Sequence, residues 1–137
     1  MSEGNNLQQL GSNETKYLYD NPSSNTLEVF ENKYKENDYT VEFETEEFTS
    51  LCPKTGQPDF AKIDISYVPN EVCVETKSLK LYLFSYRNHG SFMETITNKI
   101  MEDLVHVLSP QQLVVVGDFK VRGGINLKVT ASYFDDK

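Results

Sequence analysis

The sequence predicts a single α+β domain in which a four-stranded antiparallel sheet packs one face against two helices. Two stretches that alternate apolar and polar residues come first, two stretches with a helical repeat follow, and two apolar stretches come last. A period of two indicates a half-buried strand, whereas apolar residues at i and i+4 indicate an amphipathic helix. The expected order of elements is therefore β-β-α-α-β-β.

The composition limits the kind of protein that this chain can be. Its 137 residues suffice for one domain with one core. The net charge of −8 repels phosphate backbones, so direct nucleic-acid binding is not expected. No apolar run approaches the roughly 20 residues that cross a bilayer, and the N-terminus lacks the basic and apolar segments of a secretory signal. We therefore expect a cytoplasmic protein with no membrane contact.

The chain divides into a polar N-terminal segment and a domain. Residues 1–26 are rich in Asn, Ser, Gly, Glu and Gln, which predicts a flexible or loosely docked tail. Residues 27–137 contain no internal repeat and no low-complexity segment. They form the single predicted domain.

The first hairpin is predicted from alternation. Residues 39–44 and residues 62–67 each alternate apolar and polar side chains over the length of a strand. The intervening residues 48–60, FTSLCPKTGQPDF, contain two prolines and a glycine and predict a long loop. A connection of this length between strands often carries function.

Two helices follow the first hairpin. A short β-rich run at residues 72–75 precedes a helix that starts near Lys77, and Gly90 fits the end of this helix. The second helix is expected over residues 91–108. Its apolar side chains recur at i, i+4 spacing and are Phe92, Ile96, Ile100, Leu104 and Leu108.

The last two strands are expected over residues 113–116 and 127–133, on either side of the sequence RGGIN. We expect the apolar run 114–116 to form an open sheet edge, whose unpaired backbone groups invite pairing with another subunit. The sequence therefore predicts an oligomer.

Cys52 is the first candidate for chemistry, because it lies in the predicted loop beside Pro53 and Lys54. The thiolate is the reactive form of cysteine, and a nearby cation favours it. Asp59 follows in the same loop, where it could curl back and exchange a proton during attack on an electrophilic carbon. The alternative is a half-buried cysteine in a proline-rich loop, with Asp59 as an ordinary turn residue.

Glu75, Lys77 and Lys80 form a second charged cluster at the start of the first helix. The two lysines are about one helical turn apart, so both ammonium groups can face the same way. Arg122 precedes two glycines, and three cations with a glycine-rich turn suit phosphate groups. Solvated lysines and an ordinary hairpin turn are the alternative.

The remaining ionisable residues favour structural roles. Glu94 falls in the first turn of the second helix, where a carboxylate complements the helix dipole. Cys73 is expected to be buried, and His89 and His106 to be structural or exposed. The chain has no CxxC pair and no zinc-like spacing of histidines, so no metal site is expected. It also lacks a Rossmann fingerprint, so any nicotinamide would bind by another route.

Four segments of the chain resemble the unimodular QueF family of nitrile reductases. They are FTSLCPKTGQPDF at residues 48–60, ETKSLKLY at 75–82, FSYRNHG at 84–90 and RGG at 122–124. The likeness spans most of residues 27–133. It implies the tunnelling fold, a β-β-α-α-β-β unit shared with GTP cyclohydrolase I. It also implies a homo-oligomer of two stacked barrel rings, with active sites between neighbouring subunits.

The resemblance further implies an activity. Members of this family reduce the nitrile of 7-cyano-7-deazaguanine to 7-aminomethyl-7-deazaguanine, a step of tRNA queuosine biosynthesis. Two NADPH are consumed for each nitrile, and no metal is required. By this likeness, Cys52 attacks the nitrile carbon to form a covalent thioimide, and Asp59 supplies the proton to the nitrogen.

The same likeness implies which residues bind the two substrates. Those around the deazaguanine would be Val74, Glu75, Thr76, Met93 and Glu94. Those that bind the phosphates of NADPH would be Lys77, Lys80 and Arg122. Thr76 and Met93 depart from the family's pattern, since Ser or Leu is expected at the first position and His at the second.

A non-catalytic pterin- or purine-binding oligomer of the same fold is the alternative function. Such a protein would keep Glu75 and Glu94, but it would need neither Cys52 nor the cluster of cations. The presence of both features favours the enzyme.

Overall fold

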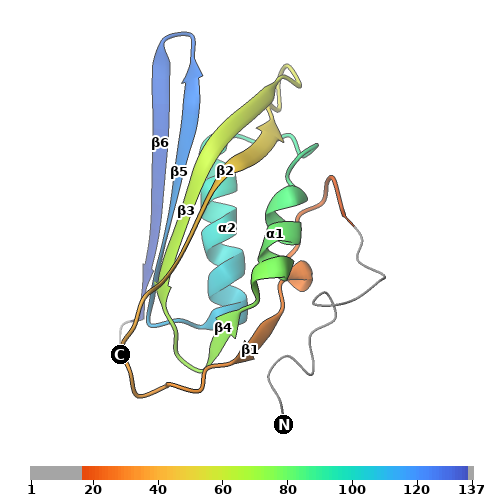
Figure 1. The fold of residues 1–137 in the computed structure, drawn as a ribbon. Helices are drawn as coiled ribbons and strands as arrows, with labels where there is room; N and C mark the ends of the chain where they lie inside the picture. The colour runs from red at the N-terminus through yellow and green to blue at the C-terminus, as the bar shows by residue number, and fades with distance from the viewer. Residues whose placement is uncertain (1–16, 136–137) are drawn as a thin grey trace.

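The computed structural model describes residues 17–135, which form two layers (Figure 1). One layer is an antiparallel sheet with the strand order β2-β3-β5-β6, and the other contains the two helices α1 and α2. The strands are β2 (Val41–Leu51), β3 (Pro58–Val68), β5 (Gln112–Arg122) and β6 (Ile125–Phe134), and the helices are α1 (Thr76–Phe84) and α2 (Met93–Leu108). The predicted α+β class and the order β-β-α-α-β-β are confirmed.

Three short elements supplement this plan. A 3-10 helix, η1 (Ser24–Thr26), precedes β1 (Val29–Glu31), and β1 pairs antiparallel with β4 (Val72–Val74) in a separate two-stranded sheet. β4 occupies the β-rich run predicted before the first helix. The sequence does not predict β1, because three residues are too few to show alternation.

The described part of the predicted tail, residues 17–26, contacts the domain. The rings of Tyr17 and Tyr19 pack edge-on against Phe84 of α1, with ring centroids 4.8 and 5.2 Å away. The carbonyl of Tyr19 accepts a hydrogen bond from the N–H of Asn88 at 2.6 Å. Residues 1–16 of the predicted tail lie outside the described residues.

The core lies between the sheet and the helices. Four apolar residues on one face of α2 are almost fully buried, as their spacing predicts: Ile96, Ile100, Leu104 and Leu108. Phe92 is the exception, because α2 begins one residue later and Phe92 is its N-cap, with an extended backbone and 55% exposure. No helix within residues 17–135 has both the length and the apolar character needed to span a membrane.

The predicted loop over residues 48–60 is wrong in extent. β2 continues to Leu51 and β3 begins at Pro58, so the turn covers only residues 52–57. Phe48 is buried and pairs with Ala61. A bulge between Thr45 and Phe48 shifts the register and leaves two successive glutamates exposed. Because the bulge interrupts the alternation of apolar and polar residues, the sequence pattern places the end of the strand too early.

The predicted sheet edge at residues 114–116 is also wrong. These residues belong to β5, which pairs with β3 on one side and β6 on the other, so the edges of the sheet are β2 and β6. In β5, Leu113 and Val115 are fully buried in the core while Val114 and Val116 are half-buried on the opposite face, so an apolar run does not by itself mark an edge strand. The predicted end of the first helix near Gly90 is wrong as well, since α1 ends at Phe84. The hydroxyl of Ser85 donates to the carbonyl of Tyr82 at 2.5 Å, and a series of turns follows.

Candidate functional site

Cys52 begins the tight turn that joins β2 to β3. The N–H of Cys52 donates to the carbonyl of Gln57, and the N–H of Gly56 donates to the carbonyl of Cys52, both at 2.9 Å. Gly56 has a φ of 71°, a left-handed conformation that glycine adopts at little cost. These contacts hold Cys52, which is half-buried, at the end of a long hairpin.

The turn makes the thiol of Cys52 more acidic than an ordinary cysteine. Hydrogen bonds from the side chain and backbone of Thr55 and from the backbone of Lys54 lower the pKa of Cys52 from 9.0 to about 7, with a smaller contribution from the charge of Arg122. Thiol and thiolate are therefore both populated at neutral pH. The thiolate is the form that attacks an electrophilic carbon.

Asp59 and Arg122 form an ion pair beside Cys52. Asp59 lies on β3 with a side chain only 3% exposed, whereas the side chain of Arg122, at the end of β5, is 36% exposed. One guanidinium nitrogen, Nη1, donates to Oδ1 of Asp59, and Nη2 donates to Oε1 of Gln57 at 3.1 Å. The carboxylate raises the pKa of Arg122. The guanidinium therefore bridges β3 and the turn that holds Cys52.

The connection between α1 and α2 supports the same turn. The N–H of Leu51 donates to the carbonyl of His89 at 3.0 Å, and the N–H of Ser91 donates to the carbonyl of Leu51 at 3.1 Å. Nδ1 of His89 lies 2.9 Å from Oδ1 of Asp20, which ties the N-terminal segment to this connection. His89 thus has a structural role, one of the two alternatives that the sequence leaves open.

Glu75 caps the N-terminus of α1. Its two carboxylate oxygens accept hydrogen bonds from the backbone N–H groups of Lys77 at 2.7 Å and Ser78 at 2.8 Å. These N–H groups have no partner within the helix, so the carboxylate satisfies them. Glu75 is 6% exposed, and each oxygen keeps a lone pair that a bound molecule could use.

A groove of about 470 Å³ lies between β2 and α1. Thr76 and Lys80 line it from the helix, and Arg87 adds a second cation. Its apolar surface comes from the side chains of Phe43, Phe48, Ile63, Ile65, Leu79, Leu83 and Phe84. An apolar groove with a few charged groups is typical of a small-molecule site.

The predicted site residues fall into three places. Cys52, Asp59 and Arg122 meet at the β2–β3 turn. The second group follows the chain from the end of β4 into α1 and contains Val74, Glu75, Thr76, Lys77 and Lys80. Met93 and Glu94 open α2, where Met93 packs against the core and Glu94 is exposed. The three predicted phosphate ligands thus lie on different elements, two on α1 and one at the end of β5.

Sequence reasoning gave no role to three residues that the structure places around this turn. Thr55 bonds to the sulfur of Cys52, Gln57 accepts from Arg122, and Ser50 pairs with Asp59 across the hairpin. All three lie inside the segment that carries the family resemblance. Their polar character within that segment is the signal that could have found them.

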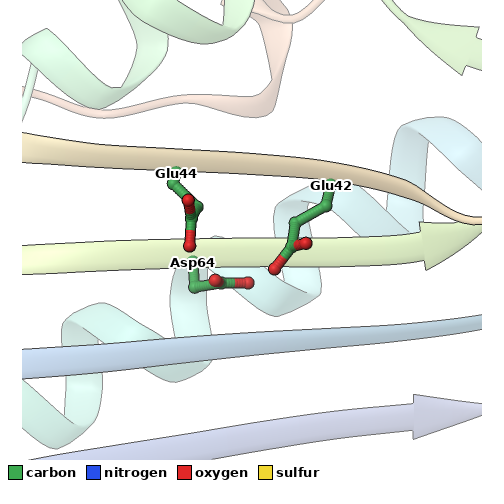
Figure 2. Close-up of side chains that lie close together, drawn as sticks. All are labelled: Glu42, Glu44 and Asp64. Carbon is green, nitrogen blue, oxygen red and sulfur yellow. The ribbon is translucent and has the colours of Figure 1, made fainter.

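Three carboxylates gather on the face of the sheet that points away from the helices, as Figure 2 shows. Glu42 and Glu44 come from β2 and Asp64 from β3, and one oxygen of each lies within 4.8 Å of the others. Burial and the neighbouring Glu42 raise the pKa of Asp64. Lys62 lies 3.5 Å from Glu44 and offsets part of the repulsion. None of the predicted site residues belongs to this cluster.

Comparison with known proteins identifies relatives along almost the whole chain. A family profile described as "QueF-like protein" matches residues 58–137. An NADPH-dependent 7-cyano-7-deazaguanine reductase of Streptococcus thermophilus is 55% identical over 131 residues, which cover 96% of this chain and 80% of the relative. The enzyme of the same name from Bacillus pumilus is 53% identical over 124 residues, which cover 90% of this chain and 74% of the relative.

A solved structure of the archaeosine synthase QueF-Like in the apo form shares the fold. It matches with a TM-score of 0.65 and 20% sequence identity, over 70% of this chain and 94% of that chain. At this identity the likeness concerns the fold alone. It agrees with the tunnelling fold expected from the sequence.

Proposed function

The chain belongs to the QueF-like protein family, and we propose that it reduces the nitrile of 7-cyano-7-deazaguanine to a primary amine through a covalent thioimide on Cys52. It is an oxidoreductase that uses NADPH, as its relatives of 53–55% identity are named. The observation that carries the covalent mechanism is the acidic thiol of Cys52 beside the ion pair of Asp59 and Arg122.

The proposed first step is addition of the Cys52 thiol to the nitrile. The sulfur forms a bond to the nitrile carbon while one carbon–nitrogen π bond breaks, and the nitrogen takes up a proton. Asp59 supplies this proton, which comes from the Cys52 thiol where the thiol is protonated and from solvent where Cys52 is already a thiolate, so the proton balance closes. The product is a thioimide that contains every atom of the nitrile.

The proposed reduction then consumes two NADPH, which supply one hydride each. With two protons, these hydrides bring the carbon to the level of an amine and release the sulfur of Cys52. Lys77, Lys80 and Arg122 are the proposed phosphate ligands, and the position of Lys80 in an apolar groove beside a second cation, Arg87, supports part of this assignment.

The proposed nucleobase site uses the carboxylates of Glu75 and Glu94, with Val74, Thr76 and Met93 beside them. Carboxylates accept hydrogen bonds from ring N–H groups. The oxygens of Glu75 keep lone pairs that are not used to cap α1. The position of Glu94, exposed at the start of α2, leaves it accessible to a ligand.

The proposal includes a homo-oligomer of two stacked rings with the substrate pocket between subunits. In the described chain, β2 and β6 form the two edges of the sheet and are 11 and 10 residues long. Long unpaired edges favour pairing with a neighbouring chain, and closure of a barrel removes them. A cytoplasmic location and a place in tRNA queuosine biosynthesis belong to the same proposal.

The test is an assay that follows NADPH oxidation and amine formation with the nitrile as substrate. The proposal predicts two NADPH oxidised for each amine formed. A non-catalytic binding protein would retain the nitrile in a binding assay and oxidise no NADPH, and that result would reject the proposed function.

A further inference from the structure

Ser50 is a buried residue whose hydroxyl has no hydrogen-bond partner among the described residues. The residue is fully buried, and its Oγ is the one buried side-chain nitrogen or oxygen without a partner in residues 17–135. A buried hydroxyl without a partner is destabilising, whereas an alanine would occupy nearly the same space at no such cost. The Ser50 hydroxyl would therefore be stabilised by a hydrogen-bond partner that it does not have in this structure.

The position of Ser50 relates it to the proposed chemistry. It pairs directly with Asp59 across the antiparallel strands β2 and β3. Side chains at directly opposed positions share one face of the sheet, with Cβ atoms about 4.5–5.5 Å apart. Cys52 lies two positions further along the chain, where the turn begins just after the end of β2.

A hydroxyl and a guanidinium differ in what they offer the two forms of a carboxyl group. Arg122 has donors only, so it pairs strongly with Asp59 as a carboxylate but offers no acceptor to the O–H of the protonated form, which has also lost its charge. A serine hydroxyl both donates and accepts, and can therefore bind either form. Asp59 is 3% exposed, which leaves its protonated form little access to water as a partner.

We propose that Ser50 is a positioning residue of this site, whose hydroxyl binds the carboxyl group of Asp59 when Arg122 is drawn away and Asp59 carries a proton. The inference rests on the proposed function, in which Asp59 is the proton carrier. Arg122 is 36% exposed and can move toward an incoming anion, whereas Ser50 is held in a strand. The serine thus keeps Asp59 in place after its charged partner has left.

The first test separates turnover from binding in the full-length Ser50→Ala variant. We expect kcat to fall about tenfold, the effect of one lost hydrogen bond, while the KM for NADPH stays within about twofold. Ser85→Ala is the matched control, because Ser85 is also buried but its hydroxyl bonds to the carbonyl of Tyr82. This control should lower the midpoint of urea unfolding and leave kcat within about twofold. An unchanged kcat in Ser50→Ala would overturn the proposal.

The second test needs no catalysis. In the wild-type background, Ser50→Ala should leave the midpoint of urea unfolding unchanged or raise it, because an unbonded hydroxyl is removed. In the Arg122→Ala background the same change should lower the midpoint, because the hydroxyl has become the partner of Asp59. An effect of the same sign in both backgrounds overturns the proposal. If the chain reduces no nitrile at all, the proposed function fails. The opposite signs of the stability change in the two backgrounds still decide whether Ser50 binds Asp59.

Discussion

At the β2–β3 turn the charged side chains face one another, whereas at the start of α1 a carboxylate faces the backbone. Arg122 binds Asp59 at the turn, and Glu75 binds the N–H groups of Lys77 and Ser78 on the helix. A side-chain partner that is partly exposed can change places when a ligand arrives. A buried carboxylate that caps a helix cannot leave without weakening that helix.

The β2–β3 turn thus contains the reactive groups, whereas the start of α1 contains a group that stabilises the fold. The turn contains an acidic thiol and an ion pair that can rearrange, so substitution of Cys52 or Thr55 should alter reactivity with little loss of stability. At the start of α1 the buried cap Glu75 is committed to the fold, so its substitution should lower stability as well as binding. Each of the following predictions tests this contrast.

Replacement of the nucleophile should have the largest effect. We expect Cys52→Ala to lower the rate of NADPH oxidation more than about a thousandfold, because the turn contains no other thiol. The free energy of unfolding should change by no more than about 0.5 kcal/mol, since Cys52 lies outside the core. Cys73→Ala is the control: Cys73 is buried, and its loss should lower stability and preserve the rate. Comparable rates for the Cys52 variant and wild type would reject the covalent mechanism.

Lys80→Ala should raise the KM for NADPH about ten- to a hundredfold, the effect of one charge-assisted phosphate contact of about 1.5–3 kcal/mol. The KM for the nitrile should change much less. Lys35→Ala removes the same charge from a residue paired with Glu31 and Glu71, and steady-state kinetics should find both constants unchanged. Equal increases in both constants for Lys80→Ala would point to a folding defect instead.

Glu75→Ala should lower the free energy of unfolding by about 0.5–2 kcal/mol, because the first turn of α1 loses its cap. Urea unfolding measures this loss, and Glu75→Gln should recover part of it, since an amide oxygen still accepts one hydrogen bond. The turn variant Cys52→Ala should show no comparable loss. If Glu75→Ala is as stable as wild type, the contrast between the two regions fails.

Thr55→Ala should have a smaller effect, confined to the thiol. Because Thr55 provides the largest of the interactions that lower the pKa of Cys52 to about 7, the variant's thiol should titrate at a higher pH, between that value and 9.0. Arg122→Ala should shift it upward by less. The rate of iodoacetamide alkylation as a function of pH measures both shifts. A downward shift in either variant, or a larger shift for Arg122→Ala, would contradict this description of the turn.

Much of the fold could be predicted because buried faces impose regular spacing on the sequence. The apolar face of α2 repeats at i, i+4, and β3 alternates strictly along its centre. The bulge between Thr45 and Phe48 interrupts that regularity, so the end of β2 could not be located. The pairing of β3 with β5 joins strands far apart in the sequence, and local patterns do not specify which strand lies at an edge.

The same distinction applies to the candidate site. Cys52 and Asp59 could be singled out because they lie in one short segment with a recognisable likeness. The ion pair between Asp59 and Arg122 joins residues 63 positions apart and depends on the pairing of β3 with β5, so no spacing rule reveals it. The cap formed by Glu75 depends on where α1 begins, and helix ends are poorly defined by sequence.

The covalent adduct on Cys52 is the most direct test of this account. Wild-type protein mixed with 7-cyano-7-deazaguanine in the absence of NADPH should gain the full mass of the nitrile, because addition of the thiol removes no atoms. Peptide mapping by mass spectrometry should locate the gain at Cys52, and the Cys52→Ala variant should gain no mass. An unmodified wild-type protein that still reduces the nitrile, or a mass gain located on another residue, would contradict the account.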